Sequence, residues 1–192
     1  KLQPPPNGRT FSFLPLAHIF ERQGLAFCVL YGGVTGFPQR GGTPLTLIED
    51  MKLFKPVHMA NVPRVLTKFE AAIKANTIEN KSLALTRNLF GRVFDTKLEL
   101  QLKVDGDPGT HFIYDNTFLK KIRTNFGLEN AQFMISGSAP IAISTLKFLK
   151  ASLNIGFGQG YGLTETFAGI CVSEFYEVNP GTCGAPGVTA EI

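Results

Sequence analysis

The chain has 192 residues, 44% hydrophobic and 18% charged, which suffices to bury the core of one ordinary domain and argues against disorder. Its formal net charge of +4 comes from lysines and arginines scattered along the chain, without the basic cluster of a nucleic-acid-binding protein. The longest apolar stretch, residues 25–31, is far shorter than the roughly 20 residues of a membrane-spanning helix. We therefore expect a globular protein that binds no nucleic acid.

Short strands alternate with helices in the first half of the chain. Residues 11–16 predict a buried strand, and residues 57–61 predict the next one. Between them, Thr43 is expected to cap a helix that begins at Pro44, and Pro63 to begin a second helix. The apolar residues at helical spacing are Leu47, Ile48, Met51 and Phe54 in the first helix and Val65, Leu66, Phe69, Ala72 and Ile73 in the second.

The middle of the chain has a weaker pattern. Within residues 76–109, the sequence predicts only a helix over 85–94 and a turn at 105–109. We therefore expect an insertion or a mobile surface segment there. A better-marked helix is predicted over 115–125, with Gly127 just past its end. Its inward residues are expected to be Phe118, Leu119, Ile122 and Phe126.

A strand-helix-strand unit is predicted next. Residues 132–135 form an apolar run, residues 143–153 have helical spacing, and the two are joined by the small residues 136–140. A glycine-rich stretch, 158–162, follows the helix. Parallel strands joined in this way send their following loops to the same sheet edge, where ligands bind in open α/β sheets. The pattern predicts an α/β fold with largely parallel sheets flanked by helices, and the two loops side by side.

The glycine-rich stretch offers chemistry suited to a nucleotide. Its alternate glycines let the backbone approach a flat ligand, and Tyr161 adds a ring between them. Thr164 and Glu165 follow at once and suit a phosphate oxygen and a magnesium ion. Neither GxxxxGK[ST] nor GxGxxG occurs there. From composition alone, a purely structural glycine-rich turn between strands is as well supported as a nucleotide site.

Three motifs resemble those of the adenylate-forming superfamily. Residues 161–165, YGLTE, resemble its YGxTE motif; residues 137–140, GSAP, resemble its adenine-site loop; and residues 14–18, LPLAH, resemble its PxxH segment beside the substrate carboxylate. The chain is similar to the fatty acyl-CoA synthetase branch over nearly all residues after the first ten, including LPLAHIFER at 14–22 and QGYGLTETFA at 159–168.

The resemblance implies a set of site residues. The nucleotide-binding residues would be Gly137, Ser138, Ala139, Gln159, Gly160, Tyr161, Gly162 and Thr164. Tyr161 would stack on adenine, Thr164 would hold a phosphate oxygen, and Glu165 would bind magnesium. His18 would orient the substrate beside the apolar run 25–30, a candidate wall of an acyl tunnel, although a core histidine is the plainer interpretation. His58 and His111 match no motif and are expected to be structural.

The implied activity is that of a fatty acid–CoA ligase using ATP, Mg²⁺ and coenzyme A on a medium- or long-chain fatty acid. Residues 1–192 would be the central part of the N-terminal domain, with the phosphate loop upstream and the lysine-bearing C-terminal domain missing. Residues 180–192, whose alternating end reads as an interrupted strand, would begin a following β subdomain. The isolated chain is then expected to be inactive.

The cysteines and the resemblance predict the cellular compartment of the protein. Cys28, Cys171 and Cys183 have no metal-like spacing and favour reduced thiols in an intracellular compartment, without disulfides. The resemblance, strongest to fungal peroxisomal members, implies a peroxisomal protein; the endoplasmic reticulum, or a lipid-associated membrane contacted peripherally, is the alternative. The competing functions are a non-catalytic acyl- or nucleotide-binding module and another adenylate-forming ligase, such as an aryl-CoA ligase.

Overall fold

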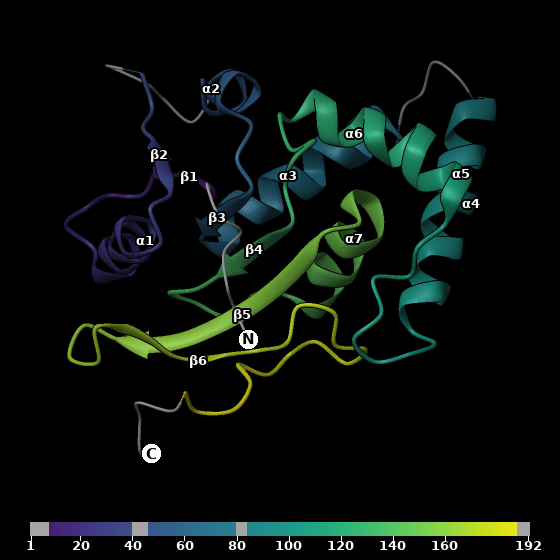
Figure 1. Ribbon diagram of the computed structural model, residues 1–192. Helices are drawn as coiled ribbons and strands as arrows, with labels where there is room; N and C mark the ends of the chain where they lie inside the picture. Colours follow the sequence, from purple (N-terminus) through teal and green to yellow (C-terminus); the bar gives the residue numbers. More distant parts are fainter. Residues whose placement is uncertain (1–7, 40–45, 80–83, 188–192) are drawn as a thin grey trace.

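A computed structural model describes residues 8–39, 46–79 and 84–187 (Figure 1). Its six-stranded sheet has the order β2-β1-β3-β4-β5-β6. The strands are β1 (Arg9–Phe11), β2 (Val34–Gly36), β3 (His58–Asn61), β4 (Phe133–Ser136), β5 (Gly156–Leu163) and β6 (Ala168–Val172). Every pair is parallel except β5 with β6, so the predicted α/β fold with a largely parallel sheet is confirmed.

Helices cover both faces of this sheet unequally. They are α1 (Ile19–Leu30), α2 (Leu47–Phe54), α3 (Pro63–Asn76), α4 (Ala84–Gln101), α5 (Phe112–Tyr114), the π-helix η1 (Asp115–Leu119), α6 (Lys120–Asn125) and α7 (Ile143–Leu153). Helix α1 lies apart from α3, α6 and α7 (Figure 1). Within the described residues, no helix is long and apolar enough to cross a membrane.

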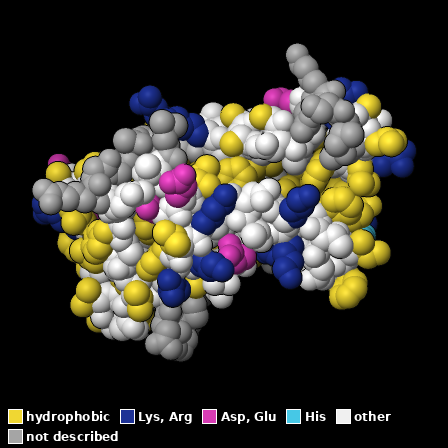
Figure 2. Space-filling model, turned by 90° about the horizontal axis from the view of Figure 1, so that it is seen from above, with side chains coloured by type: hydrophobic (Ala, Val, Ile, Leu, Met, Phe, Trp, Pro, Cys, Tyr) yellow, Lys and Arg dark blue, Asp and Glu magenta, His cyan; other side chains and the backbone are white. Residues whose placement is uncertain are grey.

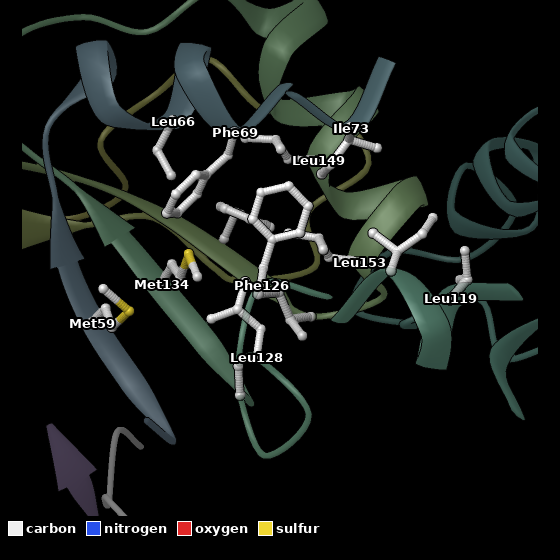
Figure 3. Packing of buried hydrophobic residues seen from close by; sticks show 14 of the residues in the cluster. Met59, Leu66, Phe69, Ile73, Leu119, Phe126, Leu128, Met134, Leu149 and Leu153 are labelled. Atoms are coloured by element: carbon white, nitrogen blue, oxygen red, sulfur yellow. The ribbon is translucent and has the colours of Figure 1, made fainter. Parts of the chain in front are cut away.

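The main hydrophobic core lies on the face covered by α3 and α7. Figure 3 shows Leu66 and Phe69 of α3 and Leu149 of α7 gathered over the methionines of the sheet. Leu66, Met134 and Leu149 are fully buried, and Met59 nearly so. Because side chains alternate across a strand, the residues next to Met59 and Met134 must point to the other face. We call these the core face and the α1 face.

Helix α3 begins and packs as predicted. Pro63 occupies its first turn, where a missing N–H leaves no helical bond unmade. The predicted strand over 57–61 is observed as β3. Helix α2 has Leu47 and Met51 buried, in line with the predicted apolar stripe. The predicted cap Thr43 and first residue Pro44 lie outside the described residues.

The first strand ends earlier than the apolar run 11–16 predicts. The predicted strand over 11–16 is wrong, because β1 ends at Phe11. Ser12 makes the last sheet contact, donating its N–H to the carbonyl oxygen of Gly36 at 2.8 Å. Pro15 cannot donate to a ladder, and the segment after Ser12 forms a turn that leads into α1.

Helix α4 contradicts the expectation of a mobile surface segment over 76–109. It runs beyond the predicted 85–94, and Val93 and Lys97 are fully buried. The Lys97 ammonium pairs with Asp115 Oδ1 at 2.7 Å and donates to the carbonyl oxygen of Gly109. The ion pair and these buried residues make α4 part of the core face.

The predicted helix over 115–125 is present with an irregular start. A π-helical turn, η1, joins α5 to α6, and the chain turns at Gly127 with a φ of 69°. Leu119, Ile122 and Phe126 are buried as predicted, and Phe118 is half-buried.

On the face seen in Figure 2, lysine and arginine side chains are spread among hydrophobic and acidic ones.

The strand-helix-strand unit is confirmed as β4, α7 and β5, in which β4 and β5 are parallel. Ile143, the first residue of α7, is 49% exposed. The glycine-rich stretch 158–162 is a strand, which corrects its assignment to a loop. A Cβ on Gly158 would lie 2.9 Å from the ring of Phe175, so this glycine makes room for Phe175. Except for Gly187, the strand-like end 187–192 lies outside the described residues.

Candidate functional site

A cavity of about 500 Å³ lies between α1, the α1 face of the sheet and the β5–β6 turn. Alternate strand residues form its floor, including His58 and Ala60 of β3 and Phe133 and Ile135 of β4. Met59, which is also among the lining residues, and Met134 have side chains buried in the core. The cavity is therefore on the opposite face from the main core.

Eight of the ten residues predicted for the site line this cavity. They are His18, Gly137, Ser138, Gly160, Tyr161, Gly162, Thr164 and Glu165. Three sequence motifs far apart in the chain thus meet at one place, and the segments at 136–140 and 158–162 lie side by side as predicted.

The other two predicted residues, Ala139 and Gln159, do not line it. Ala139 is exposed. Gln159 is buried and points elsewhere: its Oε1 accepts from the N–H of Ile141 at 3.4 Å, and its Nε2 donates to the carbonyl oxygen of Thr182 at 3.3 Å. These two hydrogen bonds hold the Gln159 side chain away from the cavity.

The turn after β5 presents Thr164 and Glu165, both exposed, at the cavity. Thr166 holds this turn together: its hydroxyl accepts from the N–H of Leu163 at 2.9 Å and donates to the carbonyl oxygen of Ala168 at 2.8 Å. The next two residues, Phe167 and Ala168, have φ values of 53° and 71°. This left-handed conformation is unfavourable for residues other than glycine, so the turn stores strain.

Gly162 is required by the close approach of the two hairpin strands. A Cβ at this position would overlap the carbonyl oxygen of Ala168. The strand pairing shifts register between Tyr161 and Gly162, which is the signature of a β-bulge. The bulge lies directly before the turn. Tyr161 is 49% exposed and lines the cavity beside the bulge.

Gly137 and Ser138 form the neighbouring part of the cavity wall. The N–H of Gly137 donates to the carbonyl oxygen of Asn61 at 3.1 Å, which continues the ladder between β3 and β4. A Cβ on Gly137 would lie 3.1 Å from the ring of Phe20, so the glycine permits α1 to approach. Ser138 has a φ of 71°, another left-handed residue at the cavity.

His18 is the N-cap residue of α1, which begins at Ile19. Its Nδ1 accepts from the N–H of Phe20 at 3.3 Å, as in a helix cap. In a neutral ring with Nδ1 accepting, the proton is on Nε2, which is then a hydrogen-bond donor. The exposed ring lines the cavity.

His58, expected to be structural, also lines the cavity. Its Nε2 is hydrogen-bonded to Thr10 Oγ1, and its ring stacks on Phe133 with centroids 5.3 Å apart. Its Nδ1 is buried and has no hydrogen-bond partner among the described residues. Burial lowers the pKa of His58 from 6.5, so the ring is held neutral.

One face of α1 was missed by the sequence analysis. The cavity-lining residues Phe20, Gln23, Gly24, Phe27 and Tyr31 recur at helical spacing. Of the apolar run 25–30, expected to wall an acyl tunnel, only Phe27 lines the cavity, while Val29 and Leu30 are more than 70% exposed. The spacing of the five residues was the available signal.

The cavity has one carboxylate, Glu165, and no lysine or arginine among its described lining residues. Across the described part of the chain, no three His, Cys, Asp or Glu residues form a group that could hold a metal ion. A single carboxylate beside a hydroxyl fits a magnesium ion that arrives with phosphates, because Mg²⁺ commonly uses one or two carboxylates together with substrate phosphates.

Comparison with known proteins gives one family. The sequence pattern described as AMP-binding enzyme matches residues 2–192. Among curated relatives, the peroxisomal acyl-CoA ligase 891 of Penicillium roqueforti is 36% identical over 93% of this chain. Long-chain-fatty-acid–CoA ligase 1 of Homo sapiens is 33% identical over 96% of it. The chain spans 25% of the length of each of these two relatives.

Solved structures give the same fold. O-succinylbenzoate coenzyme A synthetase of Bacillus subtilis, in complex with ATP and magnesium ion, has a TM-score of 0.58 at 16% identity. That match covers 95% of this chain and 28% of the other. The N-terminal domain of FACL13 from Mycobacterium tuberculosis has a TM-score of 0.53 at 14% identity, covering 88% of this chain and 30% of the other.

Proposed function

The chain belongs to the AMP-binding enzyme family, and from this premise we propose that it is the central part of an ATP-dependent fatty acid–CoA ligase. In the proposed reaction, a fatty acid carboxylate oxygen attacks the α-phosphorus of ATP and pyrophosphate leaves. The thiol sulfur of coenzyme A then attacks the acyl carbon of the adenylate, AMP leaves, and the thiol proton is released. The observation that carries the proposal is the meeting of eight predicted residues, seven of them from three motifs, in one cavity.

The nucleotide would lie at the β4–β5 end of the cavity. Tyr161 supplies a half-exposed ring, and Gly160 beside it places no side chain in the cavity. We assign to Tyr161 the stacking contact with adenine, and to Gly137 and Ser138 the packing around the base. Gln159 supports this wall from behind through its bond to Ile141.

The phosphates would lie at the β5–β6 turn. Thr164 would donate to a phosphate oxygen, and Glu165 would hold magnesium together with the phosphates. When bound, the ion would draw negative charge away from the phosphorus under attack. The strained, hydrogen-bonded turn keeps both side chains at the cavity before the substrates arrive, as an arrangement of preorganised groups requires.

The acyl chain would lie along α1. Phe20, Phe27 and Ile135 give the cavity apolar walls that suit a hydrocarbon chain. His18, with Nδ1 occupied by the helix cap, would donate from Nε2 to a carboxylate oxygen and orient it toward the nucleotide. The role of His18 in this proposal is orientation, without proton transfer.

Further segments would supply the missing charges. A triphosphate bound here would meet no lysine or arginine among the described lining residues. We propose that a phosphate loop upstream of residue 1 and a lysine-bearing domain downstream complete the site, and that residues 180–192 begin a β subdomain. The 192-residue chain alone would then form no acyl-CoA in the assay below.

Location follows the relatives. The Penicillium roqueforti relative is named peroxisomal, and we propose an intracellular, peroxisomal protein that contacts membranes only peripherally. Medium- or long-chain fatty acids would be the substrates. Binding without turnover and activation of an aryl acid are the alternatives that the experiment must separate.

The experiment incubates the full-length protein with ATP, Mg²⁺, coenzyme A and a panel of medium-chain, long-chain and aromatic acids, and measures acyl-CoA by mass. We expect fatty acyl-CoA products with release of pyrophosphate. Turnover confined to aromatic acids would identify an aryl-CoA ligase. ATP or fatty acid binding without any pyrophosphate release would identify a binding module.

A further inference from the structure

The side-chain amide of Gln23 joins α1 to the β5–β6 turn. Its Nε2 donates to the carbonyl oxygen of Phe167 at 2.7 Å, and its Oε1 accepts from the N–H of Gly169 at 3.1 Å. Both distances are those of well-formed hydrogen bonds. One amide thus bonds two backbone groups on either side of Ala168, more than 140 residues further along the chain.

The backbone that Gln23 holds is the strained part of the turn. Phe167 and Ala168 are both left-handed without being glycine, and such residues persist only where their surroundings hold them. Thr166 holds the turn from within, through its bonds to Leu163 and Ala168. Gln23 adds two hydrogen bonds from outside the turn and connects the turn to α1, a second wall of the cavity.

The two walls joined by Gln23 carry different halves of the proposed site. Helix α1 carries His18 and the apolar residue Phe20, whereas the turn carries Thr164 and Glu165. Gln23 itself lines the cavity between them. A shift of the turn relative to α1 would change the separation between the groups proposed for the carboxylate and those proposed for the phosphates.

We infer that Gln23 is a positioning residue, which fixes the Thr164–Glu165 turn against α1 so that the two walls keep one spacing. The inference rests on the proposed function, because it concerns the phosphate and metal groups of that site. Gln23 is only half-buried, so water can replace its bonds and the global stability depends little on it. Its loss should therefore appear in nucleotide use before it appears in unfolding.

The first test compares Gln23→Leu with wild type in the full-length protein. Loss of both bonds is expected to raise the KM for magnesium-ATP about 3- to 10-fold, the range of a typical hydrogen bond, with little change in thermal unfolding. Hydrogen exchange at the Gly169 amide should become faster. Gln132→Leu, an exposed glutamine directly before β4, is the matched control and should change neither quantity.

Gln23→Glu gives a readout that a packing role would not produce. An ionised carboxylate can accept from the Gly169 N–H but meets the Phe167 carbonyl oxygen as a second acceptor. The protonated acid can donate to that oxygen and restores both bonds. The KM ratio of Gln23→Glu to wild type should therefore fall toward one as the pH is lowered, whereas the Gln23→Leu ratio should stay constant.

Two failures can be told apart. If wild type shows no fatty acid-dependent pyrophosphate exchange, the proposed function fails and this inference fails with it. If wild type is active but Gln23→Leu keeps the wild-type KM, the positioning inference alone is overturned, even where the Gly169 amide exchanges faster. A pH-independent Gln23→Glu ratio above one would also contradict the donor role assigned to Nε2.

Discussion

The two faces of the sheet differ in packing although the same strands build both. On the core face, Met59 and Met134 are buried under α3 and α7 (Figure 3). On the α1 face, their neighbours His58 and Phe133 form the floor of an open cavity. Close packing stabilises the fold on the first face, whereas the second keeps space and polar groups for a ligand.

Backbone strain shows the same division. Of the non-glycine residues with positive φ, Lys55 and Asn154 end helices α2 and α7, where a left-handed residue is a common cap. Ser138, Phe167 and Ala168 end no helix and line or adjoin the cavity. Among the residues that the structure describes, strain that no capping role explains is thus concentrated at the cavity, as is usual for functional sites.

The largest effect on stability is expected from Asp115 on the core face. Asp115→Ala leaves the fully buried Lys97 without its partner, at an expected loss of about 3–5 kcal/mol. Burial lowers the pKa of Lys97, and Asp115 opposes that shift. Lys74→Ala removes the partly exposed Glu70–Lys74 pair and the cation–π contact with Phe148, and should lose only about 1–1.5 kcal/mol. Denaturant unfolding measures both, and equal losses would contradict the role of burial.

Gly162 and Gly160 sharpen the comparison within the α1 face. Gly162→Ala places a methyl group against the Ala168 carbonyl and should lower stability by at least about 1–3 kcal/mol. In Gly160→Ala the nearest atom is 3.5 Å away, an ordinary contact, so the fold should tolerate it. Thermal unfolding distinguishes the two; a stable Gly162→Ala would show that the bulge is misplaced.

Sequence patterns predicted the core face better than the α1 face. Helical spacing identified Leu66, Phe69 and Ile73 because a core helix has a continuous apolar stripe. The run 25–31 lacks such a stripe, so α1 was not predicted as a helix.

The glycines of β5 were assigned to a loop because strands rarely contain them. The reason for Gly158, the ring of Phe175, lies on a later segment and is not visible locally. Gln159 is held away from the cavity by hydrogen bonds to Ile141 and Thr182, which the motif itself does not reveal. The bonds from Gln23 to the β5–β6 turn join distant segments and have no sequence signal.

Tyr161 tests the nucleotide half of the cavity. Tyr161→Ala should weaken ATP binding by roughly 5- to 150-fold, the equivalent of about 1–3 kcal/mol of stacking, while Tyr161→Phe should bind nearly as wild type. Calorimetric titration of ATP measures both variants. Equal damage in the two would show that the hydroxyl, and not the ring, makes the contact.

The smallest expected effect is the pH dependence contributed by His58. Because burial lowers the pKa of His58, the unfolded chain takes up its proton first as the pH falls below 6.5. Stability is therefore fully present above that pH and falls by up to about 1.4 kcal/mol per unit below it, until the folded-state pKa is reached. His58→Gln should remove this component of the slope. An unchanged slope in unfolding titrations would mean that His58 is not the group responsible.

Glu165 gives the most direct test that the α1 face holds the adenylating site. The measurement is fatty acid-dependent pyrophosphate exchange by the full-length protein, with fatty acid binding measured in parallel. Glu165→Gln keeps the size of the side chain but removes the anionic metal ligand, so exchange should fall sharply while fatty acid binding persists. Glu174→Gln, an exposed glutamate that does not line the cavity, should exchange at the wild-type rate. Wild-type exchange in Glu165→Gln would remove this residue from the site and contradict the assignment.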